Sequence, residues 1–347
     1  MSNPQYCVAI RTLGTAGEKY RQTLLSLQQQ TIPPNKILVY IAQGYPIPQE
    51  TIGIEEYIYC PKGMVAQRSL PFDEIDTEWI LFLDDDIYIP RDGVEKLFAG
   101  LKQFNADCIA PNTFPNHNMS FKNKIKAILC SQTFPHRDKR WAFKIRRSGH
   151  YSYNNAPTSV MPTQSSAFSC LLCRKEAYKA IHFEDEKWID HFKYALGDDQ
   201  LFFYKLYLYG YNILIHYKCG IIHLDAQSGN NKNYREAHLN TIILRFIIWW
   251  RTRYSIQKKR REKLFCILSF GGANLIYLSY SIIHFIVKRK WYILSDLWIG
   301  NRKGYEYVHS DEYLSYPDYL AHIIQAEPKT PTDLLIKKNN TRNLTNP

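Results

Sequence analysis

The sequence predicts an α/β protein with a mostly parallel sheet flanked by helices, followed by a basic and apolar helical region. Three observations lead to this fold class. Strand and helix patterns alternate through the first half of the chain, one apolar run ends in three aspartates, and basic residues crowd the last third. With 347 residues, 45% of them hydrophobic, the chain can bury a substantial core.

Hydrophobic periodicity predicts the elements of the first hundred residues in order. Strands are expected at Tyr6–Arg11, Ile37–Ile41, Tyr57–Tyr59 and Trp79–Leu83, and helices at Gly17–Gln29, Met64–Leu70 and Val94–Phe104. This βαβ rhythm is typical of a parallel sheet. In such sheets ligands bind beyond the carboxyl ends of the strands.

Residues 112–165 are rich in Asn, His, Pro and Ser, so we expect an irregular segment bordering the site, with little helix beyond Lys122–Leu129. Regular patterns resume at Ser166. An apolar run to Cys173, a helix from about Lys175, a helix after Gly197 that stops at Gly210, and short strands at Asn212–His216 and Cys219–His223 are expected.

Three consecutive acids, Asp84, Asp85 and Asp86, follow the strand Trp79–Leu83 directly. Adjacent carboxylates repel one another unless a cation lies among them. Mg²⁺ and Mn²⁺ prefer oxygen ligands and accept a phosphate as a further ligand. A solvated acidic turn or a helix cap is the alternative interpretation. A calcium loop is not predicted, because the acids are contiguous and the Gly and distal Glu are missing.

A second acidic pair, Asp198 and Asp199, opens a predicted helix after Gly197. The helix dipole favours the anionic form there, and rigid backbone fixes the direction of the side chains, as a general base requires. A plain helix cap needs only one acid and remains the alternative. His223 ends a strand beside Asp225, and taken alone it is interpreted as structural.

Several function classes lack their motifs. GxxxxGK[ST], GxGxxG after the first strand and GxSxG are all absent, so ATPase, dinucleotide oxidoreductase and serine hydrolase readings are unsupported. Cys170 and Cys173 form a lone CxxC in an apolar stretch, which favours buried structural thiols over zinc or redox work. No apolar segment precedes Tyr6, so we expect a cytoplasmic compartment with reduced thiols.

Six segments occur in a characteristic order: CVAIRTLG, LLSLQQQTIPPNKILVYI, GMVAQRSL, WILFLDDDIYIP, ALGDDQLFFYKLYLYGYNI and IIHLD. Together they resemble the inverting family 2 glycosyltransferases with the GT-A fold, of the non-processive type that assembles bacterial glycans. The resemblance covers residues 5–235. It implies a nucleotide-sugar donor, a glycan acceptor and a divalent metal ion, Mn²⁺ or Mg²⁺.

The resemblance also implies roles for individual residues. Asp199 corresponds to the general base, with Asp198 beside it, and Asp86 and His223 correspond to metal ligands. The expected donor-binding residues are Arg11, Thr12, Arg68, Asp84 and Asp85. Such a transfer needs a cation to neutralise the departing phosphates and a separate carboxylate to take the acceptor proton. A single displacement of this type inverts the anomeric centre.

Two departures from the family pattern bear on specificity. After the second strand, relatives usually carry acids that bind the nucleotide base. This chain has Ile41-Ala42-Gln43-Gly44 there, so the sequence does not predict which nucleotide is bound. The Gln/Arg-x-x-Arg-Trp signature of processive synthases is missing near Arg245–Trp250. We therefore expect one sugar to be transferred per encounter.

The last third combines charge with apolar length. Residues 236–303 hold thirteen Lys or Arg against three acids, and Leu264–Val287 is 24 residues without a charge, long enough to span a bilayer. A polar stripe runs along this segment, formed by Asn274, Tyr277, Ser281 and His284. Basic clusters flank it on both sides, at Lys258–Arg261 with Lys263 and at Lys288–Lys290.

A single span would place one basic cluster against the positive-inside rule. An interfacial or re-entrant helix paired with Leu244–Tyr254 is therefore favoured, and a buried core helix is the alternative. Charges that bracket apolar residues suit a membrane surface, and no nucleic-acid partner is expected. The polar tail from Tyr313 is expected to fray.

These patterns predict a catalytic domain over 1–235, a membrane-associating region over 236–310 and a tail over 311–347. The expected activity is metal-dependent, inverting transfer of one sugar to a hydroxyl of a lipid-linked glycan acceptor, in cell-surface polysaccharide assembly. The expected place is the cytoplasmic face of the cell membrane, or the cytoplasm. A nucleotidyltransferase of the same fold, or a catalytically dead scaffold protein, is the alternative.

Overall fold

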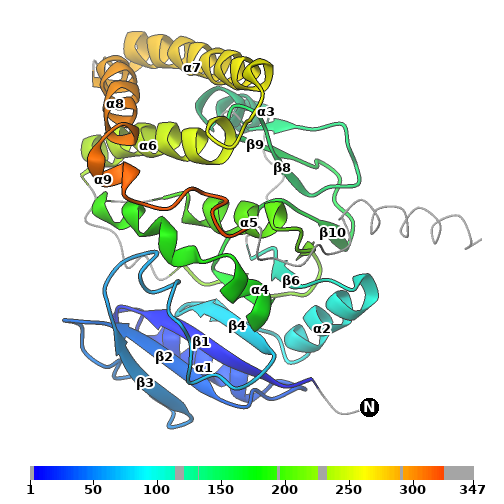
Figure 1. Ribbon diagram of the computed structural model, residues 1–347. Helices are drawn as coiled ribbons and strands as arrows, with labels where there is room; N and C mark the ends of the chain where they lie inside the picture. Colours follow the sequence, from blue (N-terminus) through cyan, green and yellow to red (C-terminus); the bar gives the residue numbers. More distant parts are fainter. Residues whose placement is uncertain are drawn as a thin grey trace, which may run out of the picture.

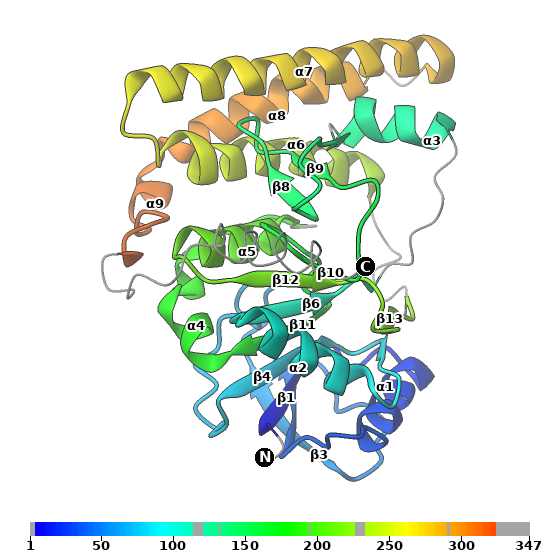
Figure 2. The same ribbon diagram turned by 90° about the vertical axis from the view of Figure 1, so that its right-hand side faces the viewer.

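The computed structural model describes residues 4–113, 121–131, 133–193, 196–225, 233–289 and 292–323. A central sheet with its covering helices forms the lower half of the molecule in Figure 1, and the helices of the last third are stacked above it. The N-terminus lies at the sheet end of the molecule, away from these C-terminal helices (Figure 2).

Eight strands form the central sheet in the order β10-β12-β6-β11-β4-β1-β2-β3. The parallel side consists of β1 (Tyr6–Thr12), β2 (Ile37–Ala42), β3 (Glu55–Cys60) and β4 (Trp79–Asp84). The mixed side consists of β6 (Cys108–Pro111), β10 (Val160–Pro162), β11 (Cys170–Arg174) and β12 (Ile213–His216). There β11 runs antiparallel between β4 and β6, and β6 is parallel to β12. The predicted α/β class is confirmed.

The sheet is covered on both faces, which is why its central strands are apolar throughout. Side chains of β1 alternate between two cores: Cys7 and Ala9 join one, and Tyr6, Val8 and Ile10 join the other. The first core includes residues of α4 (Lys175–Ala180) and α5 (Asp198–Leu208), and the second includes residues of α1 (Glu18–Gln28) and α2 (Gly93–Phe104). Cys170 and Cys173 are fully buried in β11, as predicted.

The predicted helix at Met64–Leu70 is wrong, because the chain forms turns there. The carboxylate of Asp190 accepts the backbone N–H groups of Val65 and Ala66, at 2.9 and 2.8 Å. A Cβ on Gly63 would lie 2.4 Å from the same carboxylate, so only glycine permits this approach. The predicted strand at Cys219–His223 is also shorter than expected and is confined to β13 (Ile222–His223).

Two small sheets formed by described residues flank the main one. β5 (Ile87–Tyr88) pairs antiparallel with β13. The segment expected to be irregular forms the three-stranded sheet β7-β9-β8, from Phe134–Pro135, Tyr151–Tyr153 and Phe143–Ile145. It also supplies the edge strand β10, whereas its helix is short, with α3 (Phe121–Lys126) continuing as a π-helical turn to Ser131. The irregular reading of this segment therefore needs correction.

In the part of the chain that the structure describes, four helices follow residue 233. They are α6 (Tyr234–Trp249), which continues as a π-helical turn to Tyr254, α7 (Arg260–Lys288), α8 (Tyr292–Val308) and α9 (Asp311–Leu314). Leu244, Ile247 and Ile248 of α6 belong to the core shared with the sheet. Most of Leu244–Tyr254 is thus buried, and Trp249 stacks on Phe270 of α7 with 4.2 Å between the ring centres, so the expected pairing of this stretch with Leu264–Val287 is observed.

A buried ionic cluster joins the π-helical turn after α6 to the sheet half. Glu186 is fully buried and accepts Arg251 Nη2 at 3.0 Å and Lys205 Nζ at 3.3 Å. The indole of Trp188 donates to the same carboxylate at 2.9 Å. These contacts tie α5 and the turn after α6 to one buried anion.

The start of the tail is ordered, contrary to the expectation that it frays from Tyr313. Tyr313 and Tyr319 are buried, and the Tyr319 hydroxyl donates to the Leu201 carbonyl at 2.6 Å. Arg251 also donates to the Pro317 carbonyl at 2.8 Å. The rest of the predicted tail, residues 324–347, lies outside the described part of the chain.

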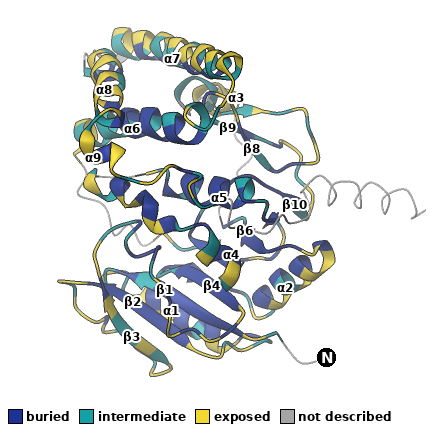
Figure 3. Ribbon diagram, in the orientation of Figure 1, coloured by how far each residue is buried: buried dark blue, intermediate teal, exposed yellow. Residues whose placement is uncertain are grey.

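Within the described residues, α7 is the one helix long and apolar enough to cross a membrane by length and composition, and 28% of its apolar window is buried. Figure 3 shows exposed positions along the outer sides of α7 and α8, whereas α6 beneath them is mostly buried. The helix is therefore covered on one side only.

Candidate active site

The candidate site begins where β1 and β4 end side by side. Their parallel register places Arg11 opposite Asp84, and Arg11 Nε donates to Asp84 Oδ1 at 2.5 Å. Thr12, the next residue of β1, donates its hydroxyl to Asp85 Oδ2 and accepts the N–H of Gly14 at 2.8 Å. Two residues predicted to bind the donor thus hold two of the three consecutive acids.

Arg68 links the two acidic sites. It lies in the turns after β3 and is buried, with its guanidinium 4.6 Å from the centre of the Phe168 ring. One nitrogen lies 3.8 Å from Asp84 Oδ1, and another contacts Asp199 Oδ1 at 3.2 Å and Asp198 Oδ2. The aspartate at the end of β4 and the pair that opens α5 therefore share one cation.

Burial and neighbouring charges oppose each other in this cluster. Burial, reinforced by Arg11, lowers the pKa of Arg68 to about 10, although Asp199 and Asp84 favour the charged form. Burial alone would raise the pKa of Asp84, but Arg11 and Arg68 outweigh it and hold that pKa below its usual value. Asp84 is therefore an anion at neutral pH.

Asp85 behaves differently from Asp84. Burial raises its pKa to about 6, its neighbours Asp84 and Asp86 add to the increase, and the Thr12 hydroxyl opposes it. The smaller part of the pKa increase, from Asp84 and Asp86, is the repulsion among adjacent carboxylates that the sequence predicts.

Asp86 and His223 meet through the small sheet of β5 and β13, where His223 is opposite Ile87. His223 Nε2 lies 3.3 Å from Asp86 Oδ1. In the described residues no cluster of three or more His, Cys, Asp or Glu could hold a metal ion. A cation here would need the phosphate oxygens of a donor as further ligands, which is how Mg²⁺ is commonly held.

Metal binding by His223 would require a different tautomer of its ring. Its Nδ1 accepts the N–H of Asp225 at 3.0 Å, so the neutral ring carries its proton on Nε2, the atom that faces Asp86. Binding of a cation through Nε2 would require the proton to move to Nδ1 and the Asp225 contact to be given up. The pair fits a metal that arrives with the donor, at the cost of one hydrogen bond.

Asp198 and Asp199 open α5 as expected, but their surroundings differ. Gly197 precedes them as the N-cap with φ 93°, and a Cβ there would lie 2.4 Å from Ile248 Cδ1. The Asp198 side chain is 5% exposed against Arg68, whereas that of Asp199 is 35% exposed. Asp199 Oδ1 accepts the N–H of Phe168 at 3.1 Å. Asp199 is therefore the accessible member of a fixed pair.

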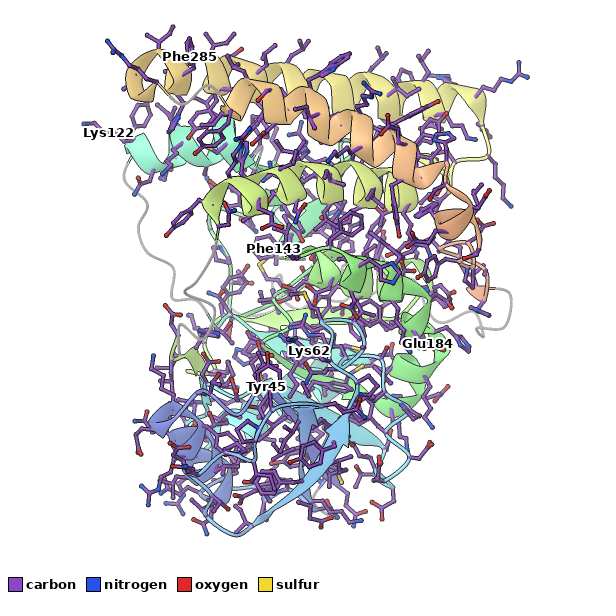
Figure 4. The ribbon with its side chains drawn as sticks, turned by 90° about the vertical axis from the view of Figure 1, so that its left-hand side faces the viewer. Tyr45, Lys62, Lys122, Phe143, Glu184 and Phe285 are labelled. Carbon is purple, nitrogen blue, oxygen red and sulfur yellow. The ribbon has the colours of Figure 1, made fainter. Side chains whose placement is uncertain are left out.

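A cavity of about 270 Å³ opens beside Asp199. It is lined by Pro111, Asn112, Thr113, Thr133, Phe143, Tyr151, Ser165, Ser166, Ala167, Asp199 and Ile215. Among the described residues of this lining Asp199 is the one charged residue, and the others offer hydroxyls, an amide and two aromatic rings. Phe143 lies between the C-terminal helices and the sheet in Figure 4. The cavity suits a neutral hydroxylated ring.

The structure thus brings Arg11, Thr12, Arg68, Asp84, Asp85, Asp198 and Asp199 into one chain of contacts, and pairs Asp86 with His223. Sequence reasoning missed Phe168, which supports Arg68 and donates to Asp199, and Tyr151 in the cavity wall. Neither belongs to a motif, and the expectation that residues 112–165 border the site covered Tyr151 but not Phe168. The roles of all these residues stay predictions.

Comparison with known proteins supports the family resemblance. Residues 52–179 match the sequence model described as glycosyl transferase family 2, which covers Arg68 and the three consecutive acids but not Asp199 or His223. No curated protein matches the sequence significantly. Among solved structures, "S. aureus TarS 1-349" is similar at 12% identity and a TM-score of 0.41, over 87% of this chain and 91% of that chain.

Proposed function

From the family 2 glycosyltransferase sequence at residues 52–179 we infer that this protein transfers a single sugar from a nucleotide-sugar donor to an acceptor hydroxyl, with inversion. The observation that carries the proposal is the position of Arg68 between Asp84 and the Asp198-Asp199 pair. Donor chemistry belongs on the Asp84 side and acceptor chemistry on the Asp199 side.

The donor side is formed by Arg11, Thr12, Arg68, Asp84 and Asp85 at the carboxyl ends of β1 and β4. Ligands of α/β sheets bind at this edge. Asp84 is anionic and held by two arginines, so its oxygens are fixed to accept hydroxyl hydrogens of a ribose. The nucleotide base stays undetermined.

Asp86 and His223 would hold the Mn²⁺ or Mg²⁺ ion, which would neutralise charge on the departing diphosphate. On the acceptor side, Asp199 takes the proton of the attacking hydroxyl. Its Oδ1 is held by Arg68 and by the N–H of Phe168, which leaves Oδ2 for that proton. Attack from the cavity, opposite the leaving diphosphate, inverts the anomeric carbon.

The acceptor is proposed to be a lipid-linked glycan met at the cytoplasmic face of the cell membrane, in cell-surface polysaccharide assembly. Two features support this: a cavity whose lining suits a sugar ring, and the one-sided burial of α7. The alternative activities have no comparable support. A nucleotidyltransferase would not need the separate carboxylate Asp199 at its own cavity, and a dead scaffold would not need intact acids at both sites.

The proposal is tested by a thermal-shift panel of nucleotide sugars with and without Mn²⁺, followed by product analysis. A ligand that binds only the native state raises the melting temperature, by an amount that reflects its affinity. We expect one nucleotide sugar to give a Mn²⁺-dependent shift and to release a nucleoside diphosphate. Formation of a nucleoside triphosphate and a sugar phosphate from the nucleotide sugar and added pyrophosphate would identify a nucleotidyltransferase, and neither shift nor product would identify a scaffold.

We predict that Asp86→Ala and His223→Ala each weaken Mn²⁺-dependent binding of the nucleoside diphosphate, measured by calorimetric titration. Because the two residues share one site, the double substitution should cost less than the sum of the single ones. His309→Ala, at an exposed histidine directly after α8, is the matched control and should bind normally. Strict additivity, or normal binding by His223→Ala, would make the histidine structural.

A further inference from the structure

The outer side of α7 carries an apolar stripe that is interrupted by the exposed Ser279. Leu268, Leu275 and Ile286 are 60%, 66% and 69% exposed, and their spacings of seven and eleven residues place them on one face of the helix. Leu264, Ile267, Ile282, Ile283 and Val287 on or beside this face are also exposed. Large apolar side chains in such number rarely stay in water without a partner.

The polar stripe of α7 faces the protein. Tyr277 and Ser281 are buried, and the Tyr277 hydroxyl lies 2.6 Å from His238 Nε2 of α6. His238 Nδ1 lies 2.9 Å from the buried carboxylate of Asp296 in α8. These contacts fix α7 to both neighbouring helices, so its apolar side is permanently turned outward.

The neighbouring helix α8 extends the same surface. Trp298 is 74% exposed, and Ile299 and Tyr305 are exposed with it. The two helices are in contact and run together across one end of the molecule, opposite the N-terminus (Figure 2). Phe285 marks the far part of α7 in this outermost layer (Figure 4). We call the exposed faces of α7 and α8 together the α7–α8 platform.

Basic charge borders the α7–α8 platform at both ends. Lys258, Lys259, Arg260 and Arg261 are exposed at the start of α7, and Arg289 is exposed at its end. The one acid near the start, Glu262, is paired with Arg147 at 3.1 Å. Trp and Tyr beside apolar residues, with Lys and Arg at the rim, form the composition of helices that lie in a lipid interface.

We propose that the α7–α8 platform docks flat on an anionic lipid surface, with the axis of α7 parallel to the membrane plane. A span is disfavoured because it would pull Tyr277 from His238 and set one basic cluster on the wrong side. A second copy of the chain is disfavoured because pairing two platforms in either direction brings basic ends together, whereas anionic headgroups complement them. The proposal goes beyond sugar transfer and does not depend on it.

The first test is flotation of the full-length protein with neutral and with anionic liposomes. The triple substitution L268Q, L275Q and I286Q should weaken binding about tenfold or more, since it removes apolar surface that enters the lipid. I47Q, at an exposed isoleucine near β2, is the matched control and should bind as the parent chain does. All four side chains are exposed, so the melting temperature should be unchanged.

The second test removes the basic charge at the start of α7 by replacing each residue of Lys258–Arg261 by Gln. Each charge removed should weaken binding to anionic liposomes about fivefold at low salt, and binding to neutral liposomes should not change. High salt should reproduce the loss in the parent chain only in part, because the apolar contacts are not screened. Equal binding by the triple variant and the parent would overturn the proposal, as would a soluble dimer that the triple substitution dissociates.

Orientation is tested by labelling from one side. Lys259→Cys and Arg289→Cys, at the two ends of α7, should both react with a membrane-impermeant maleimide added outside the liposomes. The parent chain, in which all native cysteines but the half-buried Cys130 are buried, gives the background. Protection of one introduced cysteine and not the other would show a spanning helix and overturn the flat orientation.

Discussion

Asp199→Asn is expected to lower the rate of sugar transfer by about 10²–10⁴, the usual loss when a general base is removed. Donor binding should persist, because Asp199 lies on the cavity side of Arg68 and the Asp86–His223 pair is untouched. The Asn side chain retains an oxygen for the Phe168 N–H, so the fold should be kept. Single-turnover rates and the Mn²⁺-dependent thermal shift by the donor measure the two effects separately.

Asp198→Asn is the comparison variant. Asp198 is buried against Arg68, and its loss leaves a buried guanidinium with less compensating charge. We expect a lower melting temperature and weaker donor binding from this variant, both of which Asp199→Asn should spare. Near-normal turnover by Asp199→Asn would remove that residue from the mechanism, and the base would then be Asp198.

Glu186→Gln is expected to destabilise the protein by about 3–5 kcal/mol, the cost of removing one partner from a buried ion pair. Arg251 and Lys205 are buried beside Glu186, and although Lys205 would keep Asp185 at 3.3 Å, Arg251 would lose its carboxylate partner. Urea unfolding at neutral pH measures the loss. Glu306→Gln, which breaks the exposed pair with Arg302 on α8, is the matched control and should cost only about 0.3–0.5 kcal/mol.

The same variant should change the response to acid. Burial would raise the pKa of Glu186, but Arg251 and Lys205 outweigh it and hold the folded-state pKa below its usual value. The stabilisation is therefore complete above the unfolded-state pKa, about 4.3, and is lost as the pH falls through the lower folded-state value. The parent chain should lose stability over this window, and Glu186→Gln should lose less. Parallel acid curves would contradict the assignment.

Strands with continuous apolar runs and helices with a clear apolar face were predictable, because burial on both faces leaves a pattern in the sequence. The turns at Met64–Leu70 could not be predicted, because they depend on a distant residue. The carboxylate of Asp190, 125 residues away, accepts the N–H of Val65. From the sequence Tyr319 is predicted to belong to a polar tail, whereas in the structure its hydroxyl donates to the Leu201 carbonyl. Contacts over such separations leave no local signal.

The acids of the candidate site could be located from the sequence because motif spacing marks them. The role of Arg68 as a shared partner could not, because it joins residues from two other segments that are distant along the chain. The residues of the cavity wall are harder still to predict from the sequence. Phe143 and Tyr151 come from strands of three residues, too short for periodicity to register.

The Tyr319 contact affects when the protein can complete its folding during translation. α5, which begins with Asp198 and Asp199, is completed at Leu208, but its Leu201 carbonyl and buried face meet Tyr319 and α6, which are translated later. At ordinary elongation rates this interval lasts on the order of ten seconds. A nascent chain halted before residue 319 would expose core surface to chaperones, and turnover should begin only after release.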